Sequence, residues 1–125
     1  MALVHDATAG NKIQDVIVAL YTGSGAKIEY KNASDEVVVQ FTSITATDNV
    51  FDDLSASAED PLPAGGGTVT KVVFTQNTAA GGGTTTGTVT SAGGGGDLEP
   101  TSGSATYIAG QTAELSGVAI TQALS

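Results

Sequence analysis

The stretch Thr68-Val-Thr-Lys-Val-Val-Phe-Thr75 carries the clearest strand signal in this 125-residue chain. Apolar and polar side chains alternate along it, with Val72 and Phe74 facing one way, and a period of two is that of a β-strand. Thr84–Ser91 repeats the alternation more weakly, and Gly81–Gly83 between the two stretches suits a hairpin connection. The sequence therefore predicts an antiparallel hairpin in the second half of the chain.

A second hairpin is predicted in the first half of the chain. Ala26–Lys31 and Glu36–Thr42 both alternate, and Asn32–Asp35 between them has the residue types of a turn. Three further strand-like stretches are Ser43–Thr47, Ala105–Ala109 and Thr112–Ala119. Short strands separated by glycine-rich turns are typical of all-β domains. We therefore expect a mostly β fold, either an antiparallel β-sandwich or a jelly-roll-like barrel.

One short α-helix is predicted near the N-terminus, over Asn11–Tyr21, the one stretch in which apolar residues recur at helical spacing. Asn11 is a suitable N-cap, Gln14 can complete a capping box, and Gly23 and Gly25 suit the left-handed positions that close a helix. The apolar residues at helical spacing, expected to form one buried face, are Ile13, Val16, Ile17 and Leu20.

The length fits one domain. We expect residues 1–10 to form an N-terminal arm and residues 11–125 to form a single β-rich domain. Asp48–Asp60 holds five of the 13 acidic residues and is followed by Pro61 and Pro63. Because proline ends regular structure, this segment is interpreted as a surface loop with room for one helical turn.

Charge and composition argue against several classes of partner. The chain has four Lys and Arg residues, 13 acidic residues and a formal net charge of -9, so clustered cations for a phosphate backbone are lacking and no nucleic acid is expected. No apolar run approaches the roughly 20 residues that span a bilayer, and no membrane is expected. The N-terminus lacks the pattern of a secretion signal, which predicts synthesis in a cytoplasm. Without cysteine, disulfides and thiolate sites are absent.

No catalytic residue, metal site or cofactor is predicted. The one histidine, His5, lies in the arm, where a catalytic base would not be held rigidly. Five carboxylates in or beside the acidic segment could gather around calcium, but their spacing and the missing turn glycine favour a solvated loop, and cation binding is left open. They are Asp48, Asp52, Asp53, Glu59 and Asp60. The glycine tracts lack a phosphate-binding pattern. We therefore expect a protein that is not an enzyme.

Several short motifs resemble those of small virion-associated proteins of tailed bacteriophages. The C-terminal segment Ile108-Ala-Gly-Gln-Thr112 is similar to the ending of such proteins. The order of five elements is also similar: a short helix, a Lys-Ile strand, a Val-Val-x-Phe strand, a Gly-Thr-Val-Thr-Lys strand and a Gly-Gly-Asp-Leu turn. In this chain they are Asp15–Ile17, Gly23–Ile28, Val38–Phe41, Gly67–Lys71 and Gly95–Leu98. The acidic, proline-containing segment and the glycine tracts depart from that pattern.

The resemblance implies a structural component of a phage virion. A small acidic domain without catalytic residues then favours a capsid decoration, or cement, protein that binds the major capsid protein on the capsid surface in many copies. The interface is expected to include Leu3, Val4, Val50, Phe51 and Leu54, because their segments show no obvious core role. Threonine-rich edge strands predict a homodimer or homotrimer. The alternatives are a tail or fibre component and a carbohydrate-binding β-sandwich.

Overall fold

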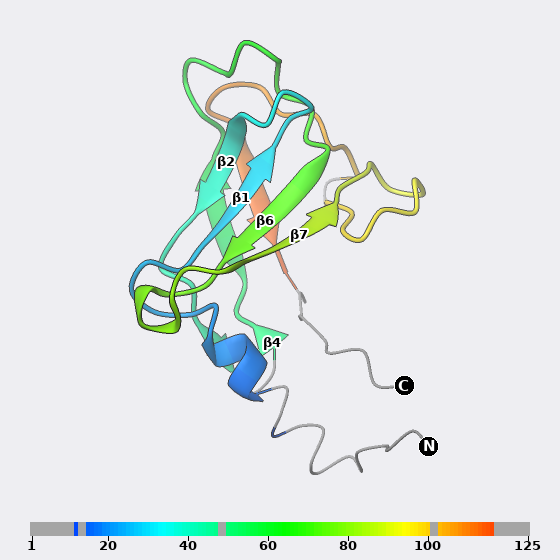
Figure 1. Ribbon diagram of the computed structural model, residues 1–125. Helices are drawn as coiled ribbons and strands as arrows, with labels where there is room; N and C mark the ends of the chain where they lie inside the picture. The colour runs from blue at the N-terminus through cyan, green and yellow to red at the C-terminus, as the bar shows by residue number, and fades with distance from the viewer. Residues whose placement is uncertain (1–11, 13–14, 48–49, 101–102, 117–125) are drawn as a thin grey trace.

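The computed structural model describes residues 12, 15–47, 50–100 and 103–116 (Figure 1). The described chain is mostly β, with antiparallel sheets, one short helix and no closed barrel, which is consistent with the expected β-sandwich. The strands are β1 (Lys27–Lys31), β2 (Val37–Phe41), β3 (Ala46–Thr47), β4 (Val50–Phe51), β5 (Leu54–Ser57), β6 (Lys71–Thr75), β7 (Thr84–Thr88) and β8 (Thr112–Leu115), and η1 (Thr78–Ala80) is a 3-10 helix.

The larger sheet contains four antiparallel strands in the order β2-β1-β6-β7. It consists of the two predicted hairpins placed side by side, with β1 pairing to β6 so that Ile28 lies opposite Phe74 and Tyr30 opposite Val72. All four of these side chains are buried, as period-two alternation requires for the face that meets the core. The β1–β2 register shifts at Tyr30/Lys31, which leaves Val38 as the extra residue of a bulge.

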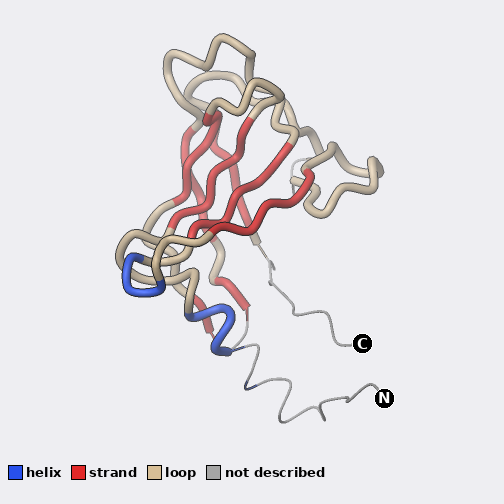
Figure 2. The backbone as a smooth tube through the Cα atoms, viewed as in Figure 1, coloured by secondary structure: helices blue, strands red, loops and turns tan. Residues whose placement is uncertain are grey.

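A second, smaller sheet pairs β5 with β8, two segments far apart in the sequence, and Ala56 lies opposite Ala113. Figure 2 shows the longer strands gathered in the middle of the molecule, with loops around them and short strand segments beside the helix. Buried residues of both sheets belong to one core cluster, including Tyr30 and Phe41 from the larger sheet and Leu115 from the smaller one. The core therefore lies between two layers, as in a sandwich.

The helix presents a face that differs in part from the predicted one. Residues 12 and 15–19 are helical, and Ile17 and Leu20 pack against the core as predicted. Val18 and Tyr21 are buried as well, whereas Val16 is 63% exposed. The prediction that Val16 belongs to the buried face is wrong, because that face includes Val18 and continues to Tyr21, whose ring packs against Phe74. Gly23 and Gly25 do adopt positive φ, 88° and 86°. The proposed caps at Asn11 and Gln14 lie outside the described residues, as does Ile13. The described residues include no helix long and apolar enough to cross a membrane.

The structures predicted for two segments need correction. The acidic segment is not only a loop, since it contains β4 and β5; the Phe51 side chain is buried, which anchors β4. Ala105–Ala109 is not a strand of a sheet, although Ala105 and Tyr107 are buried as alternation predicts. This segment makes a single bridge, Thr68 to Thr106, because its neighbour is an irregular stretch with Gly67 at close approach.

Candidate interaction surface

Three aromatic rings hold the helix and β4 at one end of the larger sheet. The ring of Tyr21 stands at 90° to that of Phe74, with centroids 6.3 Å apart, and Phe51 lies 5.9 Å from Phe74. The Tyr21 hydroxyl is also 2.6 Å from Thr85 Oγ1 on β7, within hydrogen-bonding distance. Residues 15–19 and β4 are therefore fixed near each other at the end where β4 is labelled in Figure 1.

Two branched apolar side chains are exposed on these segments. Val16 on the helix is 63% exposed and Val50 on β4 is 40% exposed. Leu54, at the start of β5, is half-buried and packs against the core. We call Val16, Val50 and Leu54 the β4-end surface. Ile108, 69% exposed, lies at the opposite end, in the loop that leads into β8.

Both ends of the described chain lie at the β4 end. Lys12 and residues 15–19 are helical at one end of the described chain, and at the other end β8 finishes at Leu115, which pairs with Leu54 of β5. The segments 1–11 and 117–125 are thus covalently joined to the domain beside the β4-end surface. Two of the predicted interface residues, Val50 and Leu54, lie in this same region, whereas the predicted arm lies outside the described residues.

The five predicted interface residues have different placements. Val50 is exposed, Leu54 is half-buried, and Phe51 is only 2% exposed, so in this chain Phe51 serves the core. Leu3 and Val4 lie outside the described residues, as do His5 and Asp48. The sequence prediction missed Val16, although three consecutive apolar residues in a helix, Val16 to Val18, cannot all face the core.

Acidic side chains mostly organise loops. Asp52 accepts hydrogen bonds from the hydroxyls of Thr45 at 2.7 Å and Thr47 at 2.8 Å, which lower the pKa of Asp52. At the edge strand β7 of the larger sheet, the backbone N–H and hydroxyl of Thr88 donate to Asp97 and lower the pKa of that carboxyl. Within the described part of the chain, no three His, Cys, Asp or Glu side chains gather in a way that could hold a metal ion.

The turn between β1 and β2 is built around the fully buried side chain of Asn32. Its Oδ1 accepts the backbone N–H groups of Ser34 and Glu36, each at 3.0 Å, and its Nδ2 donates to the Gly66 carbonyl at 3.2 Å. The Gly65 N–H donates to Glu36 Oε1 at 2.8 Å and, together with the Asn32 amide, lowers the pKa of Glu36. One buried amide thus joins the hairpin to the loop before β6.

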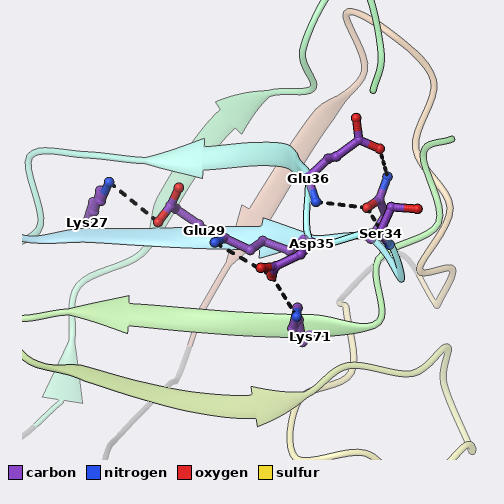
Figure 3. Close-up of polar contacts among 8 residues, drawn as sticks. Lys27, Glu29, Ser34, Asp35, Glu36 and Lys71 are labelled. Carbon is purple, nitrogen blue, oxygen red and sulfur yellow. Dashed lines mark hydrogen bonds and ion pairs between the residues drawn. The ribbon is translucent and has the colours of Figure 1, made fainter. Parts of the chain in front are cut away.

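Three of the four lysines lie on the outward face of the larger sheet (Figure 3). Lys27 lies 3.5 Å from Glu29, and Lys71 and Lys31 lie 2.6 Å and 3.8 Å from the same carboxylate, that of Asp35. The Lys71 hydrogen bond, followed by the charge of Lys31, lowers the pKa of Asp35. These lysines are engaged with carboxylates of the same face.

Two grooves accompany these features. The larger, about 550 Å³, lies between the turn that follows the helix and the segment that links β2 to β3, with Lys27 as its charged residue. The smaller, about 320 Å³, is lined by residues 53–55 and 114–116 beside the β4-end surface. Among the described residues that line the larger groove there is no histidine or carboxylate, so it offers no paired acid and base.

Comparison of the chain with models of protein families, with curated proteins and with solved structures finds no match.

Proposed function

We propose that the protein is a non-enzymatic structural protein of a bacteriophage virion, a decoration protein that binds the outer surface of the capsid in many copies. The observation that carries the proposal is the β4-end surface, where Val16 and Val50 are exposed beside the places at which both terminal segments join the domain. The resemblance of the sequence motifs to small phage virion proteins is the reason for proposing that the particle is a phage.

The composition of this surface suits a protein interface. Interfaces have an apolar centre and a polar rim. Val16 and Val50 provide exposed apolar area, and Lys12 and Asp53, exposed on the adjoining segments, provide charge around it. A surface this small gives modest affinity for one copy. Further contacts from Leu3 and Val4 in the arm would add to it, and repetition over a shell makes the coverage stable.

The proposal is tested with single charged substitutions and shell particles from which the protein has been removed. Val50→Asp and Val16→Asp each place a carboxylate in the apolar centre, and we expect binding at least about tenfold weaker, since a buried unpaired charge costs more than about 1.4 kcal/mol. Ile108→Asp is the matched control: it changes an apolar residue that is more exposed than either valine, at the opposite end, and should leave occupancy unchanged. Equal occupancy for all three variants would contradict the proposed surface.

A deletion tests the arm separately. Removing residues 1–8 takes away Leu3 and Val4 but leaves every described residue. We expect unchanged thermal stability of the isolated protein and reduced occupancy on particles. If occupancy is unchanged, the arm has no part in binding, and the contact is confined to the described domain.

A further inference from the structure

The hydrogen-bond ladder between β6 and β7 determines which groups of β7 point away from the sheet. The Gln76 N–H donates to the Gly83 carbonyl and the Val89 N–H to the Thr70 carbonyl, and Thr85 lies opposite Phe74 between them. In an antiparallel pair the residues that exchange hydrogen bonds alternate with those that do not. The N–H and C=O groups of Thr84, Thr86 and Thr88 therefore point to the far side of β7.

On the far side of β7, the backbone N–H and C=O groups of Thr88 already have hydrogen-bond partners. The Thr88 N–H donates to the Asp97 carboxylate at 2.8 Å, and the Leu98 N–H donates to the Thr88 carbonyl at 3.0 Å. Nothing within the described residues pairs in this way with Thr84 or Thr86. The open part of the edge thus extends over Thr84 and Thr86 and is closed beyond them by the chain around Asp97.

The opposite edge of the same sheet is protected. At β2 the Glu59 N–H donates to the Val38 carbonyl at 2.9 Å, so the chain that follows β5 lies along that edge. Exposed edges are usually blunted by lysine, proline or a bulge. β2 has the bulge at Val38, whereas β7 consists only of Thr and Gly, with neither charge nor proline.

We propose that β7 pairs with β7 of a second copy of this chain, antiparallel, about a two-fold axis through Thr85. In this register Thr84 of each copy lies opposite Thr86 of the other, and each of these residues donates one backbone hydrogen bond and accepts one. It is the register that uses both open residues and avoids Thr88. A two-fold pair also excludes a ring of three through this edge.

The chemistry of the edge favours a second copy as its occupant. The edge is self-complementary, and threonines facing each other across antiparallel strands make favourable pairs. Two chains of formal net charge -9 repel each other, but β7 itself contains no carboxylate. The carboxylate beside the edge, Asp97, accepts hydrogen bonds from Thr88, outside the proposed pairing of Thr84 with Thr86. Because the paired stretch is short, the association is weak and is best detected by trapping.

Thr85→Cys traps this register, and the chain has no other cysteine. Across the axis the two residues at position 85 form a non-hydrogen-bonded pair, with Cα atoms about 4.5 Å apart, within disulfide range. Thr84→Cys is the matched control, because its two thiols are diagonal neighbours about 7–8 Å apart and do not meet. Under mild oxidation of the isolated protein, we expect Thr85→Cys to form disulfide dimers at least about tenfold faster than Thr84→Cys, since pairing raises the effective thiol concentration.

Two further substitutions, each added to Thr85→Cys, test whether pairing at the β7 edge causes the cross-linking. Thr86→Pro removes an outward N–H but none of the bonds to β6, and proline is tolerated at such a position. Thr86→Lys adds charge with no backbone change. Each, combined with Thr85→Cys, should reduce cross-linking to the Thr84→Cys rate, with the melting temperature unchanged from that of Thr85→Cys alone, which already lacks the Thr85 hydroxyl that contacts Tyr21. Equal rates for the two cysteine variants, or undiminished cross-linking with Thr86→Lys, would overturn the proposal; neither result bears on capsid binding, because no particle is present.

Discussion

The Asp35 carboxylate lies 2.6 Å from the Nζ of Lys71, so the tip of the β1–β2 hairpin is tied directly to β6. Asp35 occupies the turn with φ of 66°, a left-handed conformation that Asp and Asn tolerate better than most residues. Lys31, at 3.8 Å, approaches the same carboxylate. The ion pair therefore connects the two hairpins from which the larger sheet is assembled.

Asp35→Asn tests this ion pair, because it keeps the left-handed turn and removes the charge. Exposed ion pairs contribute little, and we expect the melting temperature to fall by about 1–3 °C at low salt. The difference from the parent protein should vanish near 1 M salt, where screening is nearly complete. An equal difference at both salt concentrations would show that the carboxylate acts through something other than charge.

Acid should weaken the contact made by Glu36. Its pKa is lowered in the folded chain by the Gly65 N–H and the Asn32 amide, so the unfolded chain binds the proton more readily. The stabilisation is present above the unfolded pKa and is lost as pH falls through the folded value. Comparing the melting temperature of Glu36→Gln with that of the parent from pH 7 to pH 3, we expect the deficit of the variant to shrink below about pH 4. A deficit that is constant with pH would contradict this.

The buried amide of Asn32 should matter far more than the surface charges. Asn32→Ala leaves the N–H groups of Ser34 and Glu36 without their acceptor, and we expect a loss of about 2–4 kcal/mol in the free energy of unfolding, measured with urea. Ser34→Ala is the control, since that side chain is exposed and should change stability by less than about 0.5 kcal/mol. Similar losses for the two variants would show that the hydrogen bonds of the Asn32 side chain do not stabilise the turn.

Two tyrosines should respond in opposite directions when their hydroxyls are removed. The Tyr30 hydroxyl is buried without a hydrogen-bond partner among the described residues, and burial, with nearby Tyr107, raises the pKa of Tyr30. Tyr30→Phe should therefore raise the unfolding free energy by about 1 kcal/mol. Tyr21→Phe loses the 2.6 Å contact with Thr85 and should lower it by about 1 kcal/mol. A destabilised Tyr30→Phe variant would indicate that its hydroxyl has a partner.

Regular alternation made the two hairpins of the larger sheet predictable from sequence. β6 buries Val72 and Phe74, as the alternation indicates, and β1 buries Ile28 and Tyr30 but also Glu29 between them. β4 could not be predicted, because a strand of two residues has no period and Phe51 sits among carboxylates. Its burial depends on Phe74, which is distant in sequence.

The candidate surface was only partly visible in the sequence. Val50 was found because it is apolar within an acidic segment, whereas Val16 was assigned to the core because its helical spacing fits two faces equally well. The choice between those faces is made by Tyr21, through Phe74 and Thr85. The sequence predicted open, threonine-rich edge strands in general, but not that β7 is one of them. The extent of the open edge depends on the contact of Asp97 with Thr88, which no local pattern indicates.

The central proposal, that the protein decorates a phage capsid, is tested most directly by its copy number in purified particles of a phage that carries its gene. Quantitative mass spectrometry against the major capsid protein gives this ratio. We expect copies comparable in number with those of the major capsid protein. A few copies per particle would place the protein in the tail, and its absence from particles would contradict the account.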